Sequence, residues 1–217
     1  METFIVQEIF IYAELNMDRR KIVGAFAVAA LMTLAVATAG CTSTSPSPTP
    51  RPFAQTATTT GNNTTLTSDA GFQITFPSKY RYDQNGSTPV KFYLYLDPNN
   101  TVTGLNIGTD AQPANATLGS LSDYYYGRLL DQHYQNFTVV SQSNGTLAGK
   151  PARTLTFQAL IPVQYSEKEV RNQTLQVQEI WTLNNNTGYI ITYKAPPSDF
   201  SKFLPEAQKI VNSFQLR

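Results

Sequence analysis

The stretch "LQVQEIWTLNNNTGYIITYK", from Leu175 to Lys194, alternates apolar and polar side chains on both sides of three consecutive asparagines. A period of two places every second side chain on one face of an extended strand. In the first half that face carries Leu175, Val177, Glu179, Trp181 and Leu183. The run from Asn184 to Gly188 has turn composition, and Tyr189, Ile191 and Tyr193 continue the alternation. The stretch predicts two antiparallel strands joined by a short turn.

The same alternation recurs elsewhere in the chain. It predicts strands at 72–77, 90–96, 101–108, 137–142 and 152–157. Turn residues at 97–100 join the second and third of these into a hairpin, and we expect another turn at 143–146. A polar connection at 166–169 leads into the long strand that begins the quoted stretch, so the last three strands form a meander.

Two helices are predicted around these strands. Thr117 is a suitable N-cap for the first helix. Its apolar face carries residues spaced by three and four: Leu118, Leu121, Tyr125 and Leu129. His133 falls at the end of this helix, where we expect a capping or surface role. The second helix carries an apolar stripe from Phe200 to Phe214, and we expect Pro205 to break it into a short turn and a longer helix.

The order of strands and helices predicts an α+β domain, an antiparallel sheet with helices as covers. The roughly 148 residues from 70 to 217 suffice for one hydrophobic core.

The segments before residue 70 have the pattern of an export signal and a linker. The basic run Asp18–Lys21 precedes the apolar segment Ile22–Ala39, and the chain's one cysteine, Cys41, follows small residues. The sequence Thr38-Ala39-Gly40-Cys41 resembles a lipobox, in which the cysteine takes a lipid, although Thr38 stands where leucine is usual. This predicts a signal peptide at 17–40. It also predicts that translation starts at Met17, so that residues 1–16 are an extension from a mis-annotated start site.

The alternative is an uncleaved membrane anchor, since about 18 apolar residues span ~27 Å as a helix. In both cases the basic flank stays inside the cell and the chain after Cys41 lies outside.

Residues 41–69 are mostly Thr, Ser, Pro, Asn, Ala and Gly, a composition that predicts a disordered stalk. Prolines at every second position from Pro46 to Pro52 favour an extended backbone there.

Glycosylation sequons of the type N-x-S/T exceed the roughly three that chance gives. They begin at Asn62, Asn63, Asn85, Asn99, Asn115, Asn136, Asn144, Asn172 and Asn185. The excess predicts an N-glycosylated surface protein, and together with the lipobox it favours an archaeal envelope. The alternative is an Asn- and Thr-rich composition without attached sugar.

Composition excludes several classes of protein. The formal net charge is +1, so the chain has no charge excess suited to nucleic acid. One cysteine and one histidine exclude an intramolecular disulfide framework and multi-thiolate or multi-histidine metal sites. We therefore expect no cofactor and no metal.

Four motifs resemble the PsbP-like superfamily, which includes the extrinsic PsbP protein of photosystem II. They are "GFQITFPSKY" (71–80), "TLGSLSDYYYGRL" (117–129), "LAGKPARTLTF" (147–157) and "GYIITYKAPPSDFSKFLPEAQKIVNSFQL" (188–216). The resemblance covers nearly all of residues 70–217 and implies a sheet of about six strands between helical layers, an α/β/α sandwich. It also implies a non-enzymatic accessory role on an extracytoplasmic surface, and no metal-ligating residue is carried over.

Three functions follow as hypotheses. The first is a non-catalytic, lipid-anchored surface protein that binds a protein or glycan partner or stabilises a membrane complex. Tyr93 and Tyr95, opposite the Phe92 face, could form its contact surface if no helix covers them. The second is a carrier of a divalent cation or small ligand, using Asp97 and Asp110.

The third hypothesis is an envelope hydrolase, for which few residues are available. The candidates for acid–base chemistry are His133, Asp97, Asp110, Asp123 and Asp131. No nucleophile, metalloprotease or phosphate-loop motif occurs, so we expect the chain not to be an enzyme.

Glu179 stands on an otherwise apolar strand face, and Arg153 does the same on its own strand. We expect the two to pair across the sheet. If Glu179 is unpaired, it marks a binding site.

Overall fold

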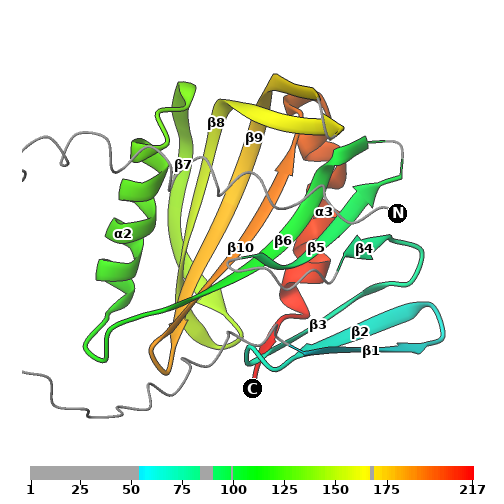
Figure 1. The fold of residues 1–217 in the computed structure, drawn as a ribbon. Helices are drawn as coiled ribbons and strands as arrows, with labels where there is room; N and C mark the ends of the chain where they lie inside the picture. The colour runs from blue at the N-terminus through cyan, green and yellow to red at the C-terminus, as the bar shows by residue number, and fades with distance from the viewer. Residues whose placement is uncertain (1–53, 84–89, 99, 167–168) are drawn as a thin grey trace, which may run out of the picture.

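The computed structural model describes residues 54–83, 90–98, 100–166 and 169–217 (Figure 1). The predicted start extension at 1–16, the signal peptide at 17–40 with Cys41, and the first part of the stalk lie outside the described residues.

A seven-stranded antiparallel sheet forms the centre of the fold, in the order β4-β5-β6-β10-β9-β8-β7. Its strands are β4 (Tyr82–Asp83), β5 (Val90–Asp97), β6 (Asn100–Ala111), β7 (Gln135–Leu147), β8 (Lys150–Ser166), β9 (Glu169–Asn184) and β10 (Thr187–Ala195). The predicted meander is confirmed, because β8, β9 and β10 are neighbours.

A second, four-stranded sheet has the order β1-β2-β3-β11. Its strands are β1 (Gln55–Thr60), β2 (Asn63–Ser68), β3 (Phe72–Pro77) and β11 (Gln215–Leu216). Two sheets of seven and four strands replace the predicted single sheet of about six. The expectation of disorder up to residue 69 is wrong for residues 55–68, which form a hairpin on β3.

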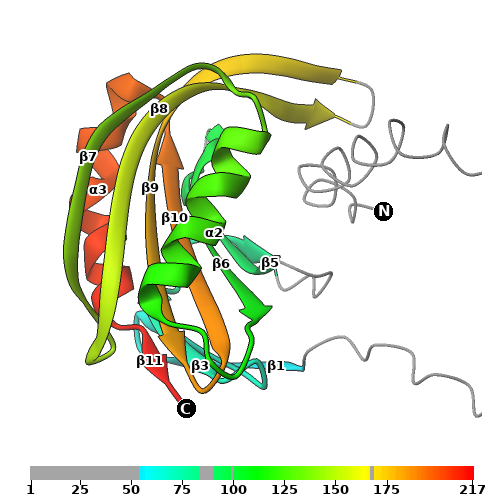
Figure 2. The same cartoon turned by 90° about the vertical axis from the view of Figure 1, so that its left-hand side faces the viewer.

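The two helices of the described residues cover opposite faces of the large sheet (Figures 1 and 2). Thr117 caps helix α2 (Leu118–Asp131): its side chain accepts a hydrogen bond from the Ser120 backbone N–H, so the predicted cap is confirmed. Helix α3 (Pro197–Asn212) runs unbroken through Pro205, so the predicted break there is wrong. The α+β class is confirmed, with the large sheet between α2 on one side and α3 with the small sheet on the other.

Each face of the large sheet has its own core. On the α3 side, the rings of Phe76 on β3 and Phe92 on β5 have centroids 5.4 Å apart. The Phe72 ring stacks at 5.7 Å on Phe214, which follows α3. On the α2 side, Leu121 and Trp181 are buried among side chains of β8 and β9. The apolar stripes of the two helices therefore face the sheet, as their spacing predicts.

Two turns fix the register of the long strands. Between β9 and β10, Asn185 and Asn186 both have positive φ (46° and 61°), as a two-residue type I′ hairpin requires. Between β7 and β8 the turn falls at Ala148 and Gly149, with φ of 50° and 75°. The predicted turn at 143–146 is wrong, since these residues pair with β8.

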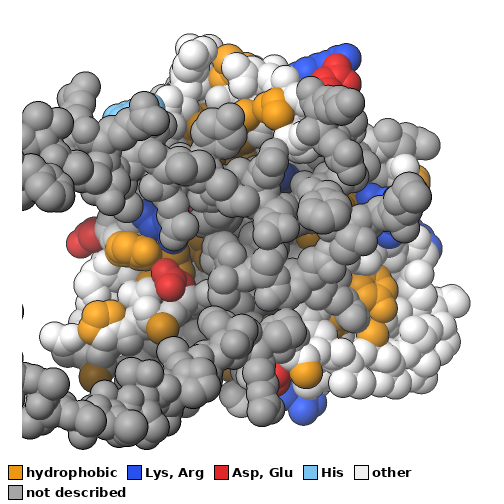
Figure 3. Space-filling view, in the orientation of Figure 1, with side chains coloured by type: hydrophobic (Ala, Val, Ile, Leu, Met, Phe, Trp, Pro, Cys, Tyr) orange, Lys and Arg blue, Asp and Glu red, His pale blue; other side chains and the backbone are white. Residues whose placement is uncertain are grey.

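Where Figure 3 leaves described residues in view, their charged side chains are scattered and do not form one patch. Among the described residues, neither helix is long and apolar enough to cross a membrane.

Candidate functional site

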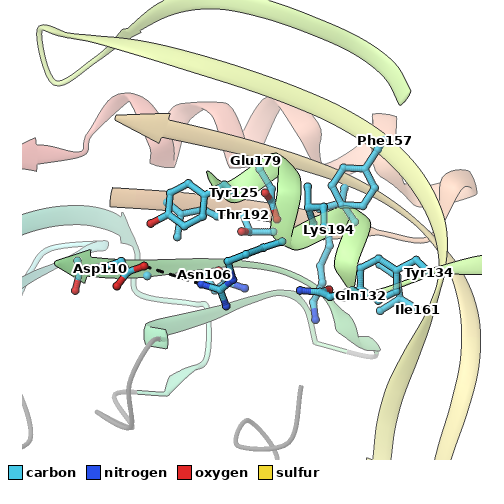
Figure 4. A pocket seen from close by; sticks show the side chains of 16 residues that line it. Asn106, Asp110, Tyr125, Gln132, Tyr134, Phe157, Ile161, Glu179, Thr192 and Lys194 are labelled. Atoms are coloured by element: carbon cyan, nitrogen blue, oxygen red, sulfur yellow. Dashed lines mark ion pairs between the residues drawn. The ribbon is translucent and has the colours of Figure 1, made fainter. Parts of the chain in front are cut away.

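A pocket of about 140 Å³ lies between α2 and the large sheet (Figure 4). We call it the α2 pocket. Strands β6, β8, β9 and β10 form its floor, and α2 with the residues just after it forms its wall. Its ionisable and amide side chains include Asp110, Tyr125, Arg128, Gln132, Glu179 and Lys194.

Strand register gathers polar side chains on the floor of this pocket. Thr192 on β10 lies opposite Asn106 on β6 and opposite Glu179 on β9. Lys194 follows two residues after Thr192 and therefore points to the same face. Three adjacent strands thus carry a polar row across a face that is otherwise apolar.

Glu179 is the acid of this row, with 8% of its surface exposed. Burial raises the pKa of its carboxyl to about 7, although the Trp181 hydrogen bond and the Arg128 charge act in the opposite direction. The Nε1–H of Trp181 donates to Oε2 of Glu179 at 3.0 Å. Near neutral pH this carboxyl is partly protonated and able to donate a hydrogen bond.

The predicted pair between Glu179 and Arg153 is wrong. Arg153 lies opposite Trp181 in the β8–β9 register, and its side chain is exposed. Its Nε–H donates to Oδ1 of Asn144 at 3.4 Å. Among the described residues, Glu179 therefore has no cationic side chain within 4.0 Å, the case for which the sequence predicts a binding site.

Lys194 is the amine of the polar row. It is partly buried, and burial lowers the pKa of its ammonium group to about 8. Its Nζ lies 5.5 Å from the centre of the Tyr93 ring. In the part of the chain that the structure describes, no carboxylate lies within 4.0 Å of this Nζ.

The helix wall contributes residues at positions 125, 128, 129 and 132, the spacing of one helical face. Tyr125 is 5% exposed, and its hydroxyl has no hydrogen-bond partner among the described residues. The same holds for the buried Oε1 of Gln132. Arg128 lies 4.0 Å from Asp110, as the dashed line in Figure 4 marks.

The rest of the lining is apolar and aromatic, with Leu129, Phe157, Ile161 and Val177 all buried. A pocket with apolar walls and a few converging polar groups is typical of small-molecule binding sites. This one offers a cation, an acid of near-neutral pKa and two buried polar atoms in need of a partner.

The structure disperses the other residues considered for chemistry. Asp110 lines the α2 pocket, Asp97 ends β5, and Asp123 and Asp131 are exposed on α2. His133 is exposed in the turn after α2, with φ of 49°. Within the described ranges, no three His, Cys, Asp or Glu side chains gather as metal ligands.

The proposed contact surface of Tyr93 and Tyr95 is wrong, because the two side chains are 6% and 5% exposed. The Tyr95 hydroxyl donates to Asp83 at 2.6 Å, and the Arg81 guanidinium lies 4.0 Å from the centre of its ring.

The described sequon asparagines are all exposed: Asn62, Asn63, Asn115, Asn136, Asn144, Asn172 and Asn185. Asn85 and Asn99 lie outside the described residues, as does the predicted lipidation site Cys41.

No protein-family model matches the chain, and no curated protein sequence matches it. Solved structures do. Cyanobacterial PsbP (CyanoP) from Synechocystis sp. PCC 6803 is 15% identical, with a TM-score of 0.49, over 76% of this chain and 92% of that one. By its name, CyanoP is a PsbP protein, the kind that the sequence motifs resemble.

Two bacterial proteins are similar at a comparable level. LpqN, involved in cell envelope biogenesis of Mycobacterium tuberculosis, is 14% identical, with a TM-score of 0.44, over 76% of this chain and 91% of that one. PA94 from Pseudomonas aeruginosa is 16% identical, with a TM-score of 0.43, over 72% of this chain and 99% of that one. These are likenesses of fold and carry no function to this chain.

Proposed function

We propose that this chain is a non-catalytic, lipid-anchored extracytoplasmic protein whose domain binds a small ligand in the α2 pocket. The anchor is the lipid on Cys41, and the residues between Cys41 and β1 hold the domain off the membrane. Seven exposed sequon asparagines are compatible with a glycosylated surface.

The observation that carries the binding proposal is the pair of unpartnered polar atoms in the α2 pocket. The Tyr125 hydroxyl and the Gln132 Oε1 are buried without a hydrogen-bond partner among the described residues. Leaving a buried polar group unsatisfied costs about 1–3 kcal/mol. A ligand that supplies the missing hydrogen bonds recovers this free energy on binding.

A small organic ligand fits better than the alternatives considered from the sequence. The α2 pocket does not favour a divalent cation, because Asp110 pairs with Arg128 and Lys194 adds a positive charge to the lining. The tyrosine surface suggested for a macromolecular partner is buried. The geometry therefore favours a carrier of a small ligand over a surface protein that binds a protein or glycan partner.

Ligand-observed NMR with a library of small fragments tests this function on the full chain. Val177 is 3% exposed and lines the pocket, so Val177→Phe fills the space that a ligand needs. Val140→Phe on β7 is the matched control, since Val140 is 52% exposed. We expect fragments to bind the wild type and the control but not Val177→Phe. A library without hits, or hits that bind all three proteins equally, overturns the proposal.

The anchor has its own test. The wild-type chain, expressed in a host that lipidates cysteines, should enter the detergent phase on phase separation and carry added lipid mass on Cys41. Cys41→Ser should lose that mass. A wild-type chain with an unmodified Cys41 and an intact leader contradicts the anchor without affecting the pocket.

A further inference from the structure

The charges of the α2 pocket are unequally compensated. Asp110 and Arg128 face each other at 4.0 Å. Glu179 accepts a hydrogen bond from Trp181 and is stabilised by the Arg128 charge. Among the described residues, Lys194 has only the Tyr93 ring, 5.5 Å from its Nζ. The uncompensated charge in the pocket is thus positive.

Two hydrogen-bond donors share the sheet face of this cation. The Asn106 amide and the Thr192 hydroxyl belong to the same polar row, opposite each other in the β6–β10 register. The unpartnered Tyr125 hydroxyl lies farther along the same pocket, beside Gly188, which precedes Lys194 by six residues on β10. A carboxylate accepts up to about four hydrogen bonds and presents a full negative charge, which matches this set of donors.

The size of the pocket limits the rest of the ligand. Its volume of about 140 Å³ is close to that of an engineered cavity of about 150 Å³ that holds benzene. The walls next to the polar row are the buried side chains of Leu129, Phe157 and Ile161. A six-membered ring or a branched chain of similar size fills this space.

From these three observations we propose that the α2 pocket binds a small monocarboxylate with an apolar body of about one ring, held by its carboxylate on Lys194. This inference rests on the proposed function and adds the chemical class of the ligand to it. The main competitor is an amine paired with Glu179. The carboxylate is favoured because Glu179 already has Trp181 and Arg128 as partners, whereas Lys194 has no counter-charge among the described residues.

Calorimetric titration of the full chain at pH 6.5 with benzoate, benzamide and benzylamine tests the proposal, because these probes share one ring and differ in charge. We expect benzoate to bind about tenfold or more tightly than the other two. Lys194→Met should weaken benzoate binding about tenfold or more and leave the benzamide affinity within about twofold. Lys202→Met, which removes an exposed lysine on α3, is the matched control and should change neither affinity.

The contrary results are distinct. Tighter binding of benzylamine or benzamide overturns the carboxylate while leaving a ligand site in the pocket. Failure of all three probes overturns the inference, and the fragment library with Val177→Phe then decides the proposed function separately. Benzoate binding that survives Lys194→Met places the carboxylate elsewhere and also overturns the inference.

A second readout needs no variant. NMR titration of lysine side chains should show that benzoate raises the pKa of Lys194, because a bound anion stabilises the ammonium form. Benzoate affinity should fall as pH rises through about 8, where Lys194 loses its proton, and the ionisation of Glu179 near pH 7 acts in the same direction. The other ionisable groups around the site are Tyr93, Asp110, Tyr125, Arg128 and Tyr134. An unchanged Lys194 pKa on saturation with benzoate contradicts the proposal.

Discussion

At the residue scale, Glu179 and Lys194 are ionisable side chains held in the α2 pocket although their charged forms are disfavoured there. Burial raises the pKa of the acid to about 7 and lowers that of the amine to about 8. Apolar side chains at these two positions would avoid that desolvation. Both residues therefore oppose folding stability near neutral pH, which is common for residues retained for binding.

Glu179→Gln tests this cost directly. The folded carboxyl keeps its proton up to about pH 7, whereas the unfolded one loses it near 4.5. The folded state thus binds more protons in this window, and the free energy of unfolding of the wild type falls as pH rises through it. Glutamine stays neutral, so the stability of the variant does not fall in this way. The free energy of unfolding of the variant minus that of the wild type should therefore increase by about 3 kcal/mol from pH 4 to pH 8.

Urea unfolding at the two pH values measures the difference. An equal effect of the substitution at pH 4 and pH 8 contradicts a raised pKa of Glu179. Loss of stability at pH 8 means instead that the carboxylate is compensated by a partner.

The sequence pointed to Glu179 and Asp110 of the pocket lining but missed Lys194, for physical reasons. Glu179 was recognisable because it interrupts a row of apolar side chains with period two. Lys194 was missed because a lysine at the end of a strand is usually a solvated charge. The two-residue Asn185–Asn186 turn sets the register that places Thr192 and Lys194 on the Glu179 face. All five residues from Asn184 to Gly188 suit a turn, so composition alone does not say which two of them reverse the chain.

At the scale of elements, α3 shows tertiary packing overriding local preference. Pro205 lacks the N–H that an interior helix residue donates, so a break was expected there. Phe200 before it and Ala207 after it are both buried against the sheet, with 3% and 1% of their surfaces exposed. Contacts on both sides of Pro205 keep the helix continuous, with Pro205 itself exposed.

Pro205→Ala should therefore stabilise the protein. Alanine restores the backbone donor and removes the ring, while the buried face of α3 stays the same. We expect a gain of about 1–3 kcal/mol in the free energy of unfolding, measured by urea titration. Gln208→Ala, an exposed change three residues later, should stay within about 0.5 kcal/mol of the wild type. A destabilised Pro205→Ala indicates that the proline fits a distortion of the helix on which the packing depends.

The turn between β7 and β8 illustrates the limit of composition. Ser143-Asn144-Gly145-Thr146 has turn composition, yet it pairs with β8 as an edge strand. The strand reverses at Ala148 and Gly149 instead, where both residues adopt positive φ. Edge residues with one free side tolerate glycine and asparagine, so turn composition alone could not place this turn.

At the scale of the whole molecule, the β1–β2 hairpin is part of the domain and not of the stalk. Its alternation was hidden by threonine, which belongs to linkers and to strands alike. Leu66 is fully buried in the same core as Phe72 and Phe76. The Tyr189 hydroxyl donates to the Ala70 carbonyl at 3.1 Å, which ties the base of the small sheet to β10.

This placement predicts where the stable domain begins. A chain that starts at residue 70 loses Leu66 and the β2 ladder on β3, whereas one that starts at residue 54 keeps both. The shorter chain should be less stable by about 3 kcal/mol or more, and Leu66→Ala in the longer chain by about 2–5 kcal/mol. Thr58→Ala on the exposed β1 strand should change stability little.

Urea unfolding of the four proteins distinguishes a hairpin that stabilises the core from one that merely lies beside it. If the chains that start at residues 54 and 70 are equally stable, the hairpin does not stabilise the core. Because α3 packs on β3 as well as on the large sheet, loss of the hairpin should also loosen α3, seen as faster amide exchange there. The α2 pocket lies on the opposite face of the large sheet, so ligand binding should survive the truncation wherever the chain still folds.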